Sequence, residues 1–275
     1  MASGILTAPS NPRRKAHPWL RQSFNRHTLR GAVTLVVFVI LWALVVAFKV
    51  PYLRLLPPPR DVAVSLLQSV ASAGYWANWW ISMVHIAVGF VAAVVVGVPL
   101  GLAMGINRTV RRFVFPIFEV LRPVPPIAWI PLAIIFWPTV SLTIYFLVFT
   151  GPFFIIVLNV MDGVREVSQN HVRAALSLGA KPRDVFWRIM LPATLPYVMT
   201  GMAVGMGVTW NVLIAAEMVT SATESGLGSM TWTAYTNGIL PVIVVGMLSI
   251  GVAGYLSSAL LRLLGERLMP WQRRI

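Results

Sequence analysis

The sequence predicts an all-α protein that crosses a membrane several times. Of its 275 residues, 57% are hydrophobic and only 11% are charged, which is too apolar for an ordinary soluble domain of this size. Long apolar runs alternate with short polar segments, and Lys and Arg gather in alternate polar segments. Because translocation disfavours Lys and Arg in short loops, these segments should face the cytoplasm. Together these observations predict six transmembrane helices with both termini in the cytoplasm.

This topology accounts for the net charge of +14 without nucleic-acid binding. Of the 22 Lys and Arg residues, 18 fall in segments assigned to the cytoplasm: six in the N-terminal tail, three near residue 110, five in a central loop and four at the C-terminus. In those places they favour contact with the anionic lipids of the bilayer. The chain has no cysteine, which excludes a disulfide framework and a cysteine metal site.

The first 30 residues are polar and basic, and they are predicted to form a mostly disordered cytoplasmic tail. The transmembrane domain is assigned to residues 31–275. Its first span covers residues 31–48, which are too long for the apolar core of a signal peptide and lack a small-residue cleavage site after them. Residues 51–75 form an external segment that contains a short surface helix over residues 61–71.

The second span covers about residues 81–105. Gly97, Gly101 and Gly105 are spaced by four, so they form a smooth strip on one helix face that permits close packing. His85 lies near the outer end of this span. An interfacial, hydrogen-bonded histidine is favoured there over a ligand-binding or proton-carrying one.

The third span is predicted to be irregular and to contain charge. Residues 123–161 hold no charged side chain, but they are barely long enough for two spans of about 20 residues. The third span should therefore begin near Phe113 and include Glu119 and Arg122, and the fourth should cover residues 139–161. At i and i+3, Glu119 and Arg122 are expected to pair on one helix face, which is favoured over contact of Arg122 with an anionic substrate. Both are also candidate residues of a transport pathway or gate.

The fifth span covers about residues 195–219, with glycines at 201, 205 and 207 that permit tight packing. An external segment rich in small and polar residues follows over 220–237. The sixth span covers about residues 238–261 and leads into a basic cytoplasmic tail.

Three side chains of the fifth span are candidates for a transport pathway or gate. Glu217 is the most informative of them, and a gating role is weighed equally against a structural carboxylate that bonds to a neighbouring helix. Asn211 and Trp210 are further pathway candidates, with core packing favoured for Trp210.

The polar loop over residues 162–192 carries the clearest motif. Gly179 is free to adopt positive φ and so to stop a helix, and Pro182 suits the first turn of the next helix. Asp184 follows in that first turn, near the positive helix end. The pattern predicts two short helices joined by a Gly bend on the cytoplasmic surface. The first helix should carry one apolar face, made of Val167, Ala174, Ala175 and Leu178.

This loop resembles the EAA loop of binding-protein-dependent ABC importer permeases, whose pattern is E-A-A-x3-G-x9-I-x-L-P. The matching positions are Ala174, Ala175, Gly179, Ile189, Leu191 and Pro192, while Arg173 stands where the family usually has Glu. By resemblance, the loop is a coupling helix that docks into a cytoplasmic ATPase. The implied contact residues are Arg173, Ala174, Ala175, Gly179, Lys181, Pro182, Asp184, Ile189, Leu191 and Pro192.

Two further runs are similar to one branch of that family. The run that begins at Arg122, RPVPPIAWIPL, resembles taurine and alkanesulfonate permeases, and the run over residues 215–218, AAEM, resembles a motif that nitrate and bicarbonate permeases share with them. The resemblance implies the type I ABC importer transmembrane fold in a bacterial inner membrane. It also implies a homodimer, two cytoplasmic ATPases, an external solute-binding protein and a small anion as substrate.

The chain itself is expected to be no enzyme and to bind no cofactor. Its lysines, at positions 15, 49 and 181, follow no G-x4-G pattern, so ATP and Mg should be bound by the partner ATPases. Two alternatives remain open at this point. An ion-coupled secondary transporter would need its own coupling site and usually internal repeats, and a membrane scaffold would need neither the Gly bend nor the Gly- and Pro-broken spans.

Overall fold

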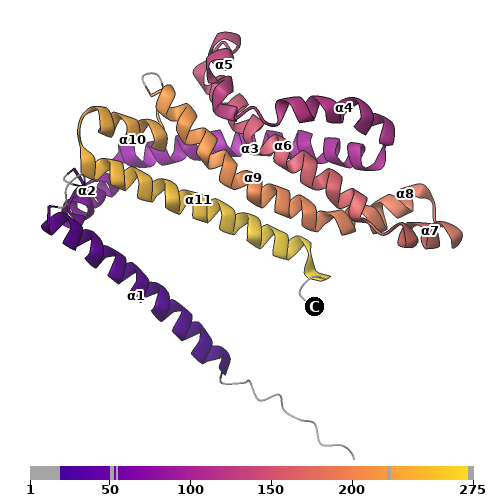
Figure 1. Ribbon diagram of the computed structural model, residues 1–275, viewed down its shortest axis with the longest axis horizontal. Coiled ribbons are helices and arrows are strands. Elements are labelled where there is room, and N and C mark those ends of the chain that lie inside the picture. Colours follow the sequence, from indigo (N-terminus) through magenta and orange to yellow (C-terminus); the bar gives the residue numbers. More distant parts are fainter. Residues whose placement is uncertain (1–18, 50–52, 54, 222–223, 272–275) are drawn as a thin grey trace, which may run out of the picture. The chain divides into compact units, whose positions relative to one another are not determined.

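The computed structural model describes residues 19–49, 53, 55–221 and 224–271, and every regular element in these ranges is a helix (Figure 1). The chain divides into two compact units, Met1–Pro59 and Arg60–Ile275, which are described separately.

The first unit contains helix α1, Trp19–Ala47. The helix begins inside the segment predicted to be a disordered tail, so the prediction of disorder is wrong for residues 19–30. The domain boundary at residue 30 stays a prediction, and residues 1–18 lie outside the described residues. No Gly or Pro interrupts the sequence between Trp19 and Arg30, and the helix continues into the apolar stretch Val36–Ala47. Near its end, Trp42 Nε1 donates a hydrogen bond to Pro57 O at 3.1 Å.

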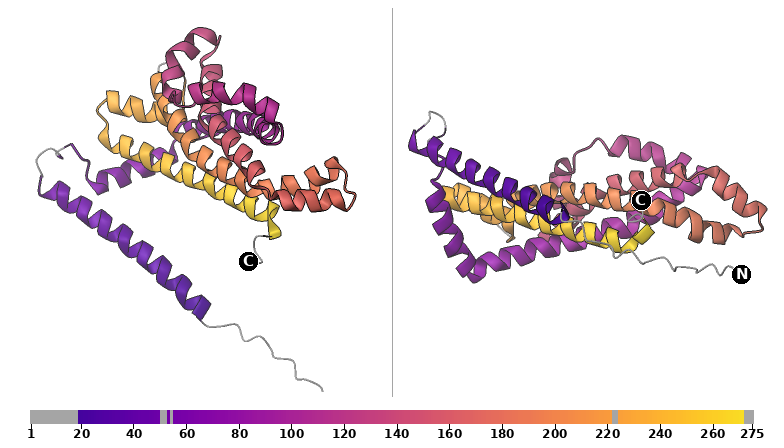
Figure 2. Two further views of the ribbon diagram at one scale, coloured as in Figure 1. Left: turned by 45° about the vertical axis from the view of Figure 1, so that its right-hand side comes forward. Right: turned by 90° about the horizontal axis from the view of Figure 1, so that it is seen from below.

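The second unit is built on four helices that are long and apolar enough to cross a membrane. They are α3 (Ala73–Ile106), α6 (Val140–Glu166), α9 (Leu191–Val219) and α11 (Leu240–Leu268). Helix α6 packs against both α3 and α9, and the buried core lies mainly along these three helices (Figures 1 and 2). The second, fourth, fifth and sixth predicted spans are thereby confirmed as long apolar helices.

The predicted glycine strip is the contact surface between α3 and α6. A Cβ atom on Gly101 would lie 2.7 Å from Val157 O, and one on Gly105 would lie 2.5 Å from Val164 Cβ. The backbones can approach this closely only because these residues lack side chains.

Two of the three glycines of the fifth span have the same role. Gly201 and Gly205 lie against Asn159 and Pro152 of α6. The prediction is wrong for Gly207, because a Cβ there would meet open space.

The third span is broken. Helix α4, Arg108–Leu121, is followed by a 3-10 turn, Pro126–Trp129, and by the short helix α5, Ile130–Phe136. The two halves are bent by 88°, as expected where prolines remove backbone donors and clash with the preceding turn. Counted as one span, the pair brings the total to five among the described residues. The predicted total of six therefore stays a prediction.

The connections are also helical. The surface helix expected over residues 61–71 is confirmed as α2, Pro59–Ala71. The external segment predicted only as small and polar contains α10, Leu227–Thr236.

The central loop contains α7, Gln169–Ser177, and α8, Pro182–Val185, which runs through a π-helical turn, Phe186–Met190, directly into α9. The predicted second short helix is therefore wrong, since one continuous helix covers Pro182–Val219. The π turn, in which Leu191 N bonds to Phe186 O, stands directly before Pro192 and lets the helix accept a residue without an N–H.

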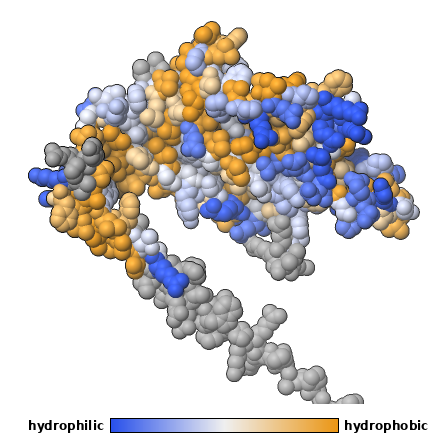
Figure 3. Space-filling model, in the orientation of Figure 1, coloured by the Kyte–Doolittle hydropathy of each residue, from blue (hydrophilic) through white to orange (hydrophobic). Residues whose placement is uncertain are grey.

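Most of the strongly hydrophilic surface of the second unit that Figure 3 shows lies at one end. This end carries the turn between α3 and α4 together with α7 and α8, and it holds the basic residues Arg108, Arg111, Arg173 and Arg183 (Figure 1). Polar loops that lie far apart in the sequence thus meet on one side of the helix bundle, which is the arrangement that the charge pattern requires.

Candidate functional site

The bend after α7 is made by Gly179, which has φ of +85°. Gly179 N donates to Leu176 O and Ala180 N donates to Ala175 O, both at 3.0 Å. This crossed pair of hydrogen bonds is the Schellman motif, which requires a residue in the left-handed region at the helix end. A Cβ on Gly179 would have nothing within 4 Å, so the backbone conformation alone selects glycine.

After the bend the chain enters α8 as the sequence predicts. Pro182 occupies the first turn and Asp184 follows it within that turn. Val185 is buried and anchors the start of this helix. The bend at Gly179 thus fixes one end of this loop, and the first-turn Pro182 and the buried Val185 fix the other.

The outer surface of this loop is apolar at three exposed positions. Leu178 is 89% exposed, and Leu176 and Trp187 are also exposed. The prediction that Leu178 shares one apolar helical face with Val167 is wrong. Val167 is buried in the turn between α6 and α7, whereas Leu178 projects from the helix end.

The motif positions divide into an exposed and a half-buried group. Arg173, Ala174, Gly179, Lys181 and Pro182 are exposed, whereas Ala175, Asp184, Ile189, Leu191 and Pro192 are half-buried. The structure therefore brings the matching positions onto one polar end of the bundle, with the second half of the motif packed where α8 continues into α9. The segment 162–166, expected in the loop, belongs to the last turns of α6.

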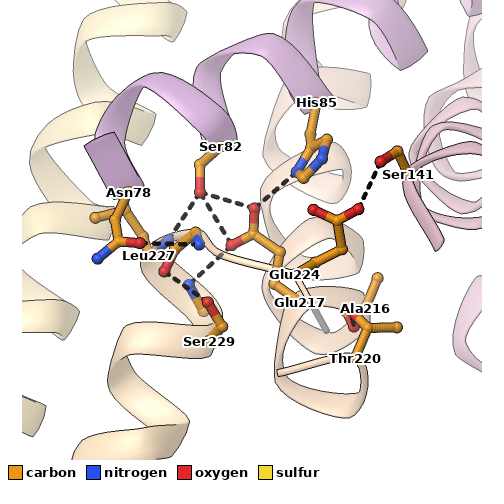
Figure 4. A network of polar contacts seen from close by, with 12 residues as sticks. Asn78, Ser82, His85, Ser141, Ala216, Glu217, Thr220, Glu224, Leu227 and Ser229 are labelled. Atoms are coloured by element: carbon orange, nitrogen blue, oxygen red, sulfur yellow. Dashed lines mark hydrogen bonds and ion pairs between the residues drawn. The ribbon is translucent and has the colours of Figure 1, made fainter. Parts of the chain in front are cut away.

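Glu217 on α9 is the centre of a second cluster, which lies in the interior of the bundle (Figure 4). The side chain is 0% exposed. Ser82 Oγ lies 2.8 and 2.9 Å from the two carboxylate oxygens, and His85 Nδ1 lies 3.0 Å from Oε1. Gly228 N donates to Oε2 at 2.8 Å. These are the contacts of a structural carboxylate bonded to neighbouring helices, and a gating role stays a prediction.

The cluster caps the start of α10. Ser82 Oγ accepts from Leu227 N at 2.9 Å, and Asn78 Oδ1 accepts from Gly226 N at 3.1 Å (Figure 4). Together with Glu217, these groups satisfy backbone donors that a helix start leaves without partners, and the carboxylate lies at the positive end of the helix.

Glycines at the start of α10 make this approach possible. A Cβ on Gly226 would lie 2.3 Å from Glu217 Cδ, and one on Gly228 would lie 2.8 Å from Glu217 Cβ. The arrangement ties α10 to α3 and α9. His85 is buried and bonds to Glu217, which confirms its predicted hydrogen-bonded state. Its predicted position at a membrane interface is not tested.

Sequence reasoning missed Ser82, Gly226 and Gly228. Ser82 and His85 are spaced by three on a mainly apolar helix, which places both on one face and was a usable signal. No feature of the sequence around Gly226 and Gly228 indicates that they pack against Glu217, which lies in the last turn of α9.

The remaining pathway candidates lie apart from this cluster. Trp210 is buried and donates from Nε1 to Ser257 Oγ at 2.9 Å, which confirms core packing between α9 and α11. Asn211 is exposed.

Glu119 and Arg122 are also exposed, and no ion pair joins them in the described part of the chain, so the predicted pairing is wrong. Exposed charges gain only about 0–1 kcal/mol from pairing, so helical spacing alone does not bring them together.

Long apolar helices, a broken span and a Gly-bent polar loop at one end define a multi-pass membrane protein. Comparison with known families makes this specific. The chain belongs to the family described as the binding-protein-dependent transport system inner membrane component, whose model matches residues 93–274. It is therefore a permease subunit of an ABC importer and not itself an enzyme, and its ATPase is a separate subunit.

Three relatives show the branch of the family. The chain is 34% identical to the taurine transport system permease protein TauC of Escherichia coli (strain K12), over 93% of this chain and 94% of that protein. It is 28% identical to the nitrate import permease protein NrtB of Synechocystis sp. (strain ATCC 27184 / PCC 6803 / Kazusa), over 98% of both. Identity to the bicarbonate transport system permease protein CmpB of Synechococcus elongatus (strain ATCC 33912 / PCC 7942 / FACHB-805) is 31%, over 70% of this chain and 66% of that protein.

A solved structure supports the fold. The MetNI methionine ABC transporter in an inward-facing conformation matches with a TM-score of 0.50 and 21% identity, over 72% of this chain and 93% of that chain. The type I ABC importer fold implied by the sequence motif is thereby confirmed.

Proposed function

We propose that two copies of this chain form the translocation path for a small oxyanion or organosulfonate, with taurine, nitrate and bicarbonate as the leading substrates. Two cytoplasmic ATPases drive transport through this path, and an external solute-binding protein delivers the substrate. All six spans cross the membrane, and both termini lie in the cytoplasm.

The observation that carries the proposal is the Gly179 loop. Its backbone is fixed by the crossed hydrogen bonds of the Schellman motif, and its exposed apolar side chains, Leu176, Leu178 and Trp187, stand on the polar end of the bundle. Singly exposed apolar side chains are common on protein surfaces, so these three support a docking site for another protein only together with the fixed bend and the family motif. In an ABC importer permease that partner is the ATPase, so this loop is the proposed coupling element.

The choice of substrate rests on relatives and not on a binding site. Permeases named for taurine, nitrate and bicarbonate align with most of this chain. These three solutes share a compact oxyanion group, which sets the proposed substrate class.

Reconstitution of the chain with its ATPase and binding protein tests the proposal. The wild-type complex should accumulate at least one of the three solutes in vesicles, and only when ATP is present on the ATPase side. The ATPase should co-purify with this chain. Failure to co-purify would contradict the coupling assignment, and ATP-independent uptake driven by an ion gradient would contradict the importer mechanism.

A further inference from the structure

A cavity of about 400 Å³ lies where the third span is broken. Arg122, Val124 and Pro126 line it from the break, and most of its remaining wall comes from α6. Its volume lies in the range of about 300–1,000 Å³ that is common for small-molecule sites. Irregular backbone at membrane depth is tolerated where it lines a cavity, and the proline-rich break meets that condition.

Arg122 is the charged side chain in the lining of this cavity. Its guanidinium has no hydrogen-bond or ion-pair partner among the described residues, although Glu119 lies one turn earlier on α4. The backbone N–H of Arg122 is already used, since it donates to Phe118 O at 2.9 Å. Among the described residues the guanidinium donates to none of the last carbonyls of α4, so it does not cap the end of that helix by a hydrogen bond. The planar set of N–H donors is therefore available to a ligand.

Polar groups of α6 complete the lining. Asn159 Nδ2 donates to Ile155 O at 2.8 Å, which leaves a second amide N–H free to point into the cavity. Thr150 uses its hydroxyl proton on Leu147 O at 2.8 Å, so it offers lone pairs but no free donor. Arg122 and Asn159 are thus the two donors that an oxyanion would meet.

We propose that Arg122 binds the transported oxyanion as it passes through this cavity, with Asn159 as a second donor. The inference rests on the proposed function and deepens it, because it assigns the anion to a place in the path. A guanidinium suits sulfonate, nitrate and bicarbonate, which all present two oxygens to its paired N–H groups. A single exposed cation and one amide make a weak site, and a path needs a site that both admits the anion and releases it.

The absence of cysteine from the chain permits a direct test with Arg122→Cys. Uptake of taurine, nitrate and bicarbonate is measured separately in vesicles that contain the full complex. The cysteine is then treated with 2-aminoethyl methanethiosulfonate, which adds a positive charge, or with 2-sulfonatoethyl methanethiosulfonate, which adds a negative one. Each reagent forms a mixed disulfide with the thiolate and releases methanesulfinate. Val120→Cys, which lies on the exposed side of α4, and the untreated and treated wild-type complex are the controls.

Arg122→Cys should lower uptake at low substrate concentration by about tenfold, the scale of one lost charge-assisted hydrogen bond, while ATPase co-purification is unchanged. The cationic reagent should restore part of the uptake and the anionic reagent should restore none, and Arg122→Lys should keep part of the activity, since an ammonium supplies the charge but not the paired N–H groups. Uptake by Arg122→Cys within twofold of wild type would overturn the site. So would equal restoration by both reagents, which would show a role of volume and not of charge. A wild-type complex that takes up none of the three solutes would overturn the substrate class itself, a pattern distinct from the other two.

Discussion

Glu217 shows at the residue scale how a carboxylate is accommodated inside an apolar bundle. Both of its oxygens accept hydrogen bonds, from Ser82, His85 and Gly228 N. A buried charge is tolerable only when its lone pairs are satisfied in this way. The sequence marked Glu217 as unusual because it stands alone in an apolar run. It did not identify the partners, since those come from α3 and from the start of α10 and meet only through tertiary packing.

Replacement of Glu217 by Ala should therefore destabilise the packing of α10 on α3 and α9. Two or more buried donors would lose their acceptor, at about 1–3 kcal/mol each, so the expected loss in free energy of unfolding is about 2–6 kcal/mol. Thermal unfolding in detergent would measure it. Val204→Ala, at an exposed position of α9, is the matched control and should stay close to wild type. An unchanged melting temperature for Glu217→Ala would show that the cluster does not hold α10.

The loop from α7 to α8 shows at the scale of an element where sequence rules succeed and where they fail. The bend at Gly179, the first-turn Pro182 and Asp184 all follow from local backbone chemistry, and the structure confirms each of them. The continuation through Pro192 does not follow from those rules. A proline normally predicts a helix boundary, but the π turn before it keeps the helix intact.

The prediction for the third span is right about the irregular backbone and wrong about the ion pair. Its prolines predicted irregularity, and the structure has a bend of 88° between its two halves. Spacing within a helix predicted that Glu119 and Arg122 pair, but spacing gives proximity and not the burial that would make a pair favourable. Which side of α4 is buried is decided by Phe118 and its ring neighbours Phe153 and Phe154 on α6.

Gly179→Val should impair coupling and leave the bundle intact. Valine at a φ of +85° either accepts roughly 1 kcal/mol of strain or changes the bend, because a β-branched side chain disfavours that region. The variant should remain inserted in the membrane, and it should either bind the ATPase less well or hydrolyse ATP without matching transport. ATPase pull-down and uptake per ATP hydrolysed would be measured together.

Gly179→Asn is the matched control for this change, since asparagine tolerates the left-handed region and should keep most of the coupling. A well-expressed Gly179→Val variant with wild-type transport would mean that this loop is not the coupling element.

At the scale of the whole molecule, the pattern of charge and hydropathy along the sequence predicts more than the number of helices. The positions of four spans and the gathering of basic loops at one end of the second unit agree with the sequence prediction. The start of the first helix at Trp19 does not agree with the prediction. A stretch without Gly or Pro can continue a helix even where its composition favours disorder. The orientation in the membrane depends on the translocation machinery and the bilayer, so it needs a separate measurement.

Single cysteines at Ser177 and Ser225 would provide that measurement. Ser177 lies in α7 at the polar end, and Ser225 lies in the connection before α10; both are exposed. The basic loops place Ser177 in the cytoplasm, whereas Ser225 follows a span that leads outward. In intact cells an impermeant thiol reagent should therefore label Ser225→Cys and leave Ser177→Cys unlabelled until the membrane is opened. The cysteine-free parent chain gives the background. Labelling of both positions in intact cells would place α7 and the start of α10 on one side of the membrane. That result would contradict a single crossing of the membrane by α9.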